Sequence, residues 1–117
     1  MLAPDGSGVE VPEALRPWSW LIGRWIGVGT GQYPTIDQEA SFSTDGRAFL
    51  SYGSGSWRLD DDGNRIRPLA TEAGFWRPQL DNGMELTLSH PTGYAEIWYG
   101  RLEVTGLENA MVTGARA

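Results

Sequence analysis

Histidine and carboxylate side chains are the groups in this chain that could carry acid–base chemistry. His90 is the single histidine, and the sequence contains no cysteine. A nucleophilic triad is unsupported, because His90 is not accompanied by a serine-elbow pattern and no thiol is present. Paired carboxylates could come from several glutamates, but strand alternation sends many of them outward and singles out no pair. These glutamates are Glu39, Glu72, Glu85, Glu96 and Glu103.

His90 admits two interpretations. It ends the alternating segment 84–90, so it shares a face with Leu88 and could present a ring nitrogen at the mouth of a barrel. It would then be a substitute metal ligand. The alternative is structural, because a histidine before a proline, here Pro91, at a strand end more often bonds the turn. We favour the structural role and assign no catalytic residue and no metal ligand.

An acidic segment could bind a hard cation through alternate oxygen ligands, which are Asp60, Asp62 and Asn64. A calcium loop, however, has its glycine after the third ligand and an acidic residue six positions further on. Here Gly63 precedes the third ligand, and position 70 is Ala70. We therefore predict a solvated hairpin tip.

Large aromatic side chains are frequent, and they could either line a pocket for a flat ligand or form the core. We expect most of them to be core. The set comprises Trp18, Trp20, Trp25, Trp57, Phe75, Trp76, Trp98 and Tyr99.

Length and charge narrow the class of protein. The chain has 117 residues, the size of one domain. Nine basic and fifteen acidic side chains give a net charge of -6, which disfavours a nucleic-acid partner. No apolar run approaches the roughly 20 residues of a spanning helix, so we expect no membrane partner. Residues 1–10 do not resemble a signal peptide and are expected to be a disordered tail, and the lack of cysteine suits the cytoplasm.

Glycine and turn residues at short intervals predict an all-β protein built of hairpins. The expected strands are residues 23–30, 38–43, 48–57, 67–78, 84–90, 94–101 and 102–105. A helical turn is expected at residues 12–15, where Pro12 suits the first turn and Pro17 limits the helix. The apolar segment 18–22 should then cover one end of the sheet as a lid.

A G-x-W-x-G-x-G motif is the most specific pattern in the chain, and its residues are Gly23, Trp25, Gly27 and Gly29. Three further segments follow it in order, at residues 46–50, 72–78 and 90–93. Together these elements resemble the nitrobindins, haem-binding barrels that are similar in fold to fatty-acid-binding proteins. The resemblance covers most of residues 18–100.

The resemblance implies an up-and-down antiparallel β-barrel of the calycin type, which holds ferric haem b through an axial histidine and isomerises peroxynitrite to nitrate. In the family the closing strands and that histidine would follow the region of Arg101, whereas no histidine follows His90 here. His90 matches the turn motif of the family rather than its ligand. We therefore expect residues 11–117 to be one nitrobindin-like barrel domain that is incomplete at its C-terminus, with haem binding and isomerase activity lost or weakened.

Residues 33–35 match a stretch that lies near haem in the family, so Thr35 is expected to be a haem neighbour. The same stretch could instead be a turn that shapes the rim of the barrel. An incomplete barrel would also expose two unpaired edges and favour homo-oligomers. Two other functions stay open, which are a carrier of an apolar small molecule such as a fatty acid, without catalysis, and a vestigial barrel without a ligand.

Overall fold

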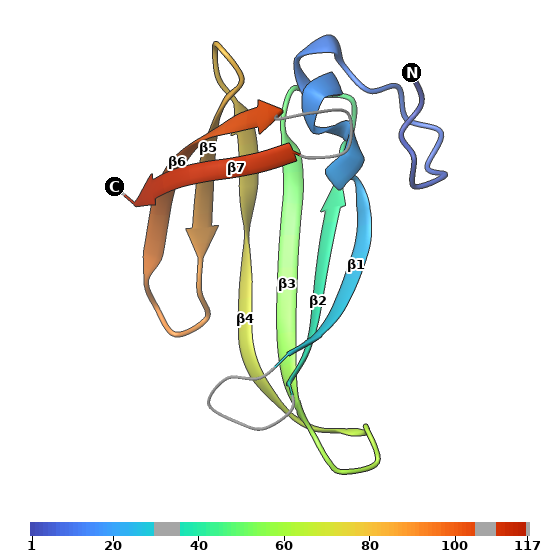
Figure 1. Cartoon of the computed structure of the whole chain (residues 1–117), viewed down its shortest axis with the longest axis vertical. Helices are drawn as coiled ribbons and strands as arrows, with labels where there is room; N and C mark the ends of the chain where they lie inside the picture. Colours follow the sequence, from blue (N-terminus) through green and yellow to red (C-terminus); the bar gives the residue numbers. More distant parts are fainter. Residues whose placement is uncertain (30–35, 105–109, 117) are drawn as a thin grey trace.

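A computed structural model describes residues 1–29, 36–104 and 110–116, with residues 104 and 110–116 described by their backbone alone. One short helix precedes a single antiparallel sheet in which each strand pairs with the next along the chain (Figure 1). The predicted all-β, up-and-down antiparallel class is confirmed. The elements are η1 (Glu13–Leu21), β1 (Gly23–Gly29), β2 (Ile36–Ser43), β3 (Leu50–Leu59), β4 (Arg65–Pro78), β5 (Gly83–Ser89), β6 (Ala95–Val104) and β7 (Ala110–Arg116).

The last two strands differ from the expectation. β6 runs unbroken through Arg101 and Leu102, so the predicted division between these two residues is wrong. Arg101 and Leu102 are adjacent, so no turn residues separate the two predicted segments and the strand continues. β7 was not predicted at all, and it pairs with β6 from Val104↔Ala110 to Trp98↔Arg116.

The helix η1 is a 3-10 helix that continues through Pro17, so the expected end at this proline is wrong. Its buried side chains are Leu15, Trp18 and Leu21, which recur every third residue. A 3-10 helix has three residues per turn, so this spacing puts all three on one face. That face lies over one end of the sheet as the predicted lid (Figure 1).

The core joins the lid to strands from both halves of the sheet. Trp18 packs edge-on against Trp76 of β4, with ring centroids 6.3 Å apart. Burying such large apolar side chains supplies most of the free energy that favours folding. The buried cluster comprises Ala3, Val11, Leu15, Trp18, Leu21, Ile22, Phe42, Leu50, Met84 and Leu102.

The first ten residues were expected to be a disordered tail, and in the structure they fold back on themselves. Leu2 and Glu10 form an antiparallel bridge, and the Ala3 amide donates to the Val9 carbonyl at 2.8 Å. Ala3 is buried in the core cluster. Burial of a small apolar side chain among larger ones is what attaches this segment to the domain.

Glycine is required at one point between β4 and β5. A Cβ on Gly74 would lie 1.7 Å from the carbonyl oxygen of Thr87, a distance that no real contact allows. Gly74 pairs with Leu88, so the missing side chain lets the two strands approach closely at this register.

Alternation gives the sheet two faces. We call the face that packs in or against the core the inner face, and it carries Ala40, Phe42, Leu50, Tyr52, Trp76 and Met84. Paired residues of antiparallel strands point to the same face, and Trp25 pairs with Ala40. Trp25 and the alternate glycines of β1 therefore lie on the inner face. The opposite face is called the outer face.

Candidate functional site

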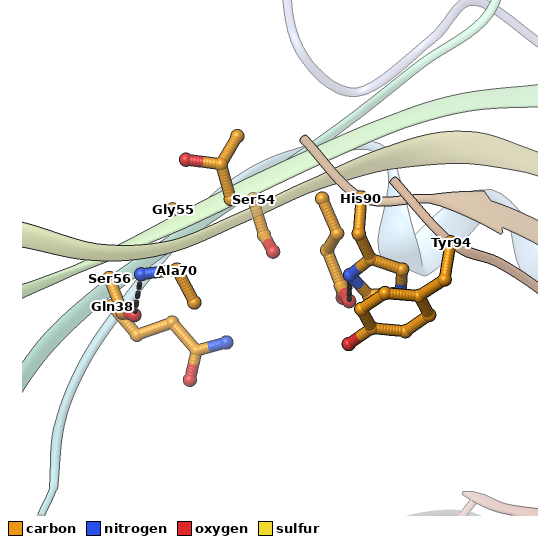
Figure 2. A pocket seen from close by; sticks show the side chains of 9 residues that line it. Gln38, Ser54, Gly55, Ser56, Ala70, His90 and Tyr94 are labelled. Atoms are coloured by element: carbon orange, nitrogen blue, oxygen red, sulfur yellow. Dashed lines mark hydrogen bonds and ion pairs between the residues drawn. The ribbon is translucent and has the colours of Figure 1, made fainter. Parts of the chain in front are cut away.

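A pocket of about 260 Å³ lies on the inner face, between β2, β3 and β4 and the turn that joins β5 to β6. Figure 2 shows His90 and Tyr94 side by side at one end of it, with Gln38 and Ser56 at the other. The lining residues are Gln38, Ser54, Gly55, Ser56, Ala70, Thr71, Glu72, His90 and Tyr94.

His90 sits between two carboxylates. Its Nε2 lies 3.0 Å from Glu96 Oε2, and its Nδ1 lies 3.9 Å from Glu72 Oε2. The imidazole ring also stacks on Tyr94, with the centroids 4.1 Å apart and the planes inclined by 12°. These contacts fix the orientation of the ring. The side chain of His90 is only 12% exposed, so it has little freedom to turn toward another partner.

Tyr52 anchors the second carboxylate. Its hydroxyl donates a 2.7 Å hydrogen bond to Glu72 Oε1. Burial, together with this neighbouring carboxylate, raises the pKa of the Tyr52 phenol to about 12. The phenol is therefore a neutral donor at physiological pH, and it holds Glu72 in place.

Strand register explains why these groups meet. Glu72 pairs with Ser54 across β3 and β4, and Glu96 pairs with Leu88 across β5 and β6. Both glutamates therefore share the inner face with His90, which continues the alternation of β5 beyond Leu88. The chain turns back at once, because the His90 carbonyl accepts from the Gly93 amide at 3.0 Å.

A row of paired residues connects the pocket to β1 on the inner face. Gly27 pairs with Gln38, Gln38 with Ser56, and Ser56 with Ala70. A Cβ added to Gly27 would meet no atom of the described residues within 4 Å. The inner face is therefore open at the β1 end of this row.

The motif of β1 borders the same surface. Trp25 donates from Nε1 to the carbonyl of Leu21 at 2.8 Å, yet 48% of the residue is exposed. Gly23, Gly27 and Gly29 share its face by alternation. Thr35, the expected haem neighbour, lies outside the described residues.

The other expectations for single residues have mixed outcomes. Asp60 Oδ1 accepts from the amides of Asp62 and Asn64, at 3.0 and 2.8 Å, so this segment is a hairpin tip. The expectation that most of the large aromatic residues are core is wrong. Trp18 is buried and Trp76 packs against the core. Four others are about half exposed, and they are Trp20, Trp25, Phe75 and Tyr99. Across the described ranges, no group of three or more histidine, cysteine, aspartate or glutamate side chains is arranged to hold a metal ion.

Sequence reasoning missed the two glutamates around His90. The sequence contained part of the information, because pairing of the two strands that flank the turn at residues 90–93 puts Glu96 on the same face as Leu88. The contribution of Glu72 required the register of β4, which no local pattern sets. The predicted strand 94–101 begins one residue too early, because Tyr94 precedes β6 and stacks on His90, a contact that no local pattern predicts.

Comparison with known proteins gives a consistent answer. A family model described as "THAP4-like, heme-binding beta-barrel domain" matches residues 14–115. The ferric nitrobindin-like protein of Streptomyces avermitilis is 41% identical over 118 residues, which cover 93% of this chain and 62% of that protein. The peroxynitrite isomerase of Nocardioides sp. is 44% identical over 110 residues, which cover 82% of this chain and 67% of that protein.

A solved structure agrees in fold. The crystal structure of Rv2717c from M. tuberculosis superposes with a TM-score of 0.72 at 31% identity, covering 91% of this chain and 72% of that one. The chain spans 62% of the length of the Streptomyces avermitilis relative. The motif of β1, the antiparallel sheet and these matches together show that the chain belongs to the nitrobindin family of haem-binding β-barrel domains.

Proposed function

We propose that the inner face of this sheet is the wall of a nitrobindin-type ligand pocket that contacts haem b without ligating its iron through His90. The observation that carries the proposal is the contrast between the open glycine positions of β1 and a histidine whose two ring nitrogens both face carboxylates. Peroxynitrite isomerisation, the activity named for several relatives, is therefore not expected of this chain by itself.

The wall suits a flat, largely apolar group. Gly27 and Gly29 leave open space on the inner face, since an added Cβ at either would meet no atom within 4 Å in the part of the chain that the structure describes. Trp25 lies between Gly23 and Gly27 on that face and is half exposed. An aromatic ring beside bare backbone offers contact area to a planar ligand.

Iron ligation does not suit His90. A neutral imidazole nitrogen is the common protein ligand of haem iron. His90 Nε2 is 3.0 Å from Glu96, and the side chain is 12% exposed. Ligation would require His90 to leave Glu96 and Tyr94, and the buried Glu96 carboxylate would lose a charge-assisted partner.

The test is a titration of the purified chain with ferric haem, followed by both the Soret band and tryptophan fluorescence. We expect saturable quenching of fluorescence together with a broad Soret band similar to that of free haem. Gly27→Leu should weaken the quenching about tenfold, because the new side chain fills the open wall. Gly53→Leu is the matched control, since Gly53 lies on the outer face with equal open space.

His90 is tested in the same titration with two variants. His90→Ala removes the imidazole, and His90→Gln keeps a hydrogen-bonding group beside Glu96 but offers iron no imidazole nitrogen. Both should leave the spectrum unchanged. A sharp, saturable Soret band that both variants lose would overturn the proposal and identify His90 as the ligand.

A carrier of an apolar small molecule is the second candidate, and the exposure of Trp25 favours it. An indole that is 48% exposed beside an open glycine row is suited to an apolar chain as well as to a flat ring. Titrating tryptophan fluorescence with fatty-acid analogues in the absence of haem separates the two. An unchanged spectrum across a broad panel would exclude this candidate.

Self-association and location complete the proposal. β1 and β7 are the end strands of the sheet in the described part of the chain. Unpaired strand edges favour pairing with a second copy, so we propose a homo-oligomer.

None of the helices that the structure describes is long and apolar enough to cross a membrane. We propose the cytoplasm as the site of action because the chain has no cysteine.

A further inference from the structure

We propose that the pocket beside His90 binds a small planar organic cation, of the amidinium or aromatic ammonium class, which contacts the Glu72 carboxylate and the ring of Tyr94 where these line the pocket. This inference goes beyond contact with haem and does not depend on it. The pocket of about 260 Å³ is equivalent to roughly nine water volumes, at about 30 Å³ each. It is therefore suited to a molecule of about ten non-hydrogen atoms.

The charge of the pocket selects a cation. Glu72 lines it, and none of the described lining residues is arginine or lysine. Glu72 Oε1 accepts the hydrogen bond from Tyr52, whereas Oε2 lies 3.9 Å from His90 Nδ1, which is beyond hydrogen-bond distance. The side chain is 29% exposed. An oxygen held in place in this way can accept a charge-assisted hydrogen bond from a bound N–H group.

The aromatic wall selects a planar group. One face of the Tyr94 ring stacks on His90, and the residue is 53% exposed. Tyr94 also lines the pocket, so part of its ring is within reach of a bound ligand. A cation over an aromatic face is attracted by the ring quadrupole, and a planar cation also gains stacking area. His90 already holds the ring in place, so the side chain of Tyr94 loses little conformational freedom on binding.

Neutral polar groups from two strands complete the site. Gln38, Ser54 and Ser56 come from β2 and β3 and bring a carboxamide and two hydroxyl groups to the pocket (Figure 2). Amide and hydroxyl oxygens accept hydrogen bonds from the N–H groups of an amidinium without adding charge. Glu72 therefore supplies the charge recognition, and these residues provide the remaining acceptors.

The experiment is isothermal titration of the haem-free chain with benzamidine, a planar amidinium, and with benzamide, its neutral analogue of the same shape. We expect saturable binding of benzamidine and at least tenfold weaker binding of benzamide. Glu72→Gln keeps an acceptor for Tyr52 but removes the charge, and Tyr94→Leu removes the ring. Each should weaken benzamidine binding by about tenfold.

Two outer-face variants are the matched controls. Glu103→Gln removes a carboxylate, and Tyr99→Leu removes a half-exposed ring, both away from the pocket. Both should bind benzamidine as the unmodified chain does. Equal binding of benzamidine and benzamide, unchanged binding by Glu72→Gln and Tyr94→Leu, or no saturable binding at all would each overturn the proposal. Because haem is left out, this outcome is separate from the result of the Soret titration.

Discussion

The Tyr52 hydroxyl and the Glu72 carboxylate are joined by a 2.7 Å hydrogen bond between β3 and β4. Burial and this carboxylate raise the pKa of Tyr52 from 10.0 to about 12. A phenol whose pKa is higher in the folded state than in the unfolded state stabilises the fold at pH values below its unfolded-state pKa. This stabilisation is lost as the pH rises through its folded-state pKa. We predict loss of stability as the pH rises from about 10 to about 12.

Alkaline titration checks this prediction. Tyrosinate absorbance of the native chain, minus that of Tyr52→Phe, should show one phenol ionising near pH 12, and the same difference after unfolding should lie near 10. The free energy of unfolding of Tyr52→Phe should also fall less steeply in this range. A difference curve centred near 10 in the folded chain would contradict the assignment.

Gly74→Ala should destabilise the fold strongly. The new methyl group would lie 1.7 Å from the Thr87 carbonyl oxygen, so β4 and β5 must move apart. We expect a loss of about 2 kcal/mol or more in urea unfolding. Gly53→Ala on β3 is the control, because its Cβ would meet nothing within 4 Å. It should be neutral or slightly stabilising, and equal losses in the two variants would show that close approach is not the cause.

Trp18→Ala should remove much of the packing that holds η1 against the sheet. Trp18 is 1% exposed and touches Trp76, so the variant leaves a cavity at one end of the sheet. We expect a loss of about 3–5 kcal/mol in the free energy of unfolding. Trp20→Ala, at a residue that is 46% exposed on the same helix, should cost less than half as much. Similar losses would mean that η1 does not pack through one face.

Self-association should depend on the edge strand β1. Ile26 and Val28 are 62% and 70% exposed on its outer face. The double variant Ile26→Lys/Val28→Lys should shift the chain toward monomer in sedimentation velocity, because charged side chains block edge pairing. Leu80→Lys is the control, since Leu80 is 91% exposed in the turn between β4 and β5. A chain that is monomeric before substitution would contradict the proposed oligomer.

Local patterns in the sequence predicted much of the sheet. Turn residues with positive φ, such as Gly63 and Gly93, lie where hairpins were expected. Alternation in segment 84–90 predicted one shared face, and Met84 and Leu88 of that face are both buried. These features depend on neighbours along the chain, and a single sequence therefore contains them.

The features that the sequence did not predict have a common physical origin. Pro17 was expected to end the helix, but burial of residues on both sides of it keeps the 3-10 turns together. Glu72 and His90 meet only because β4 and β5 adopt one register, which the close approach at Gly74 permits. Such long-range packing is set by the whole sheet, and no short motif specifies it.

The core also determines the order in which the chain can become stable during synthesis. Leu15 leaves the ribosome early, whereas Leu102 of the same buried cluster follows only after most of the sheet has emerged. Part of the apolar face of the first helix therefore stays exposed to water until these later residues have been made, and contacts so distant in sequence form slowly. We expect the nascent chain to depend on chaperones until β6 has been made.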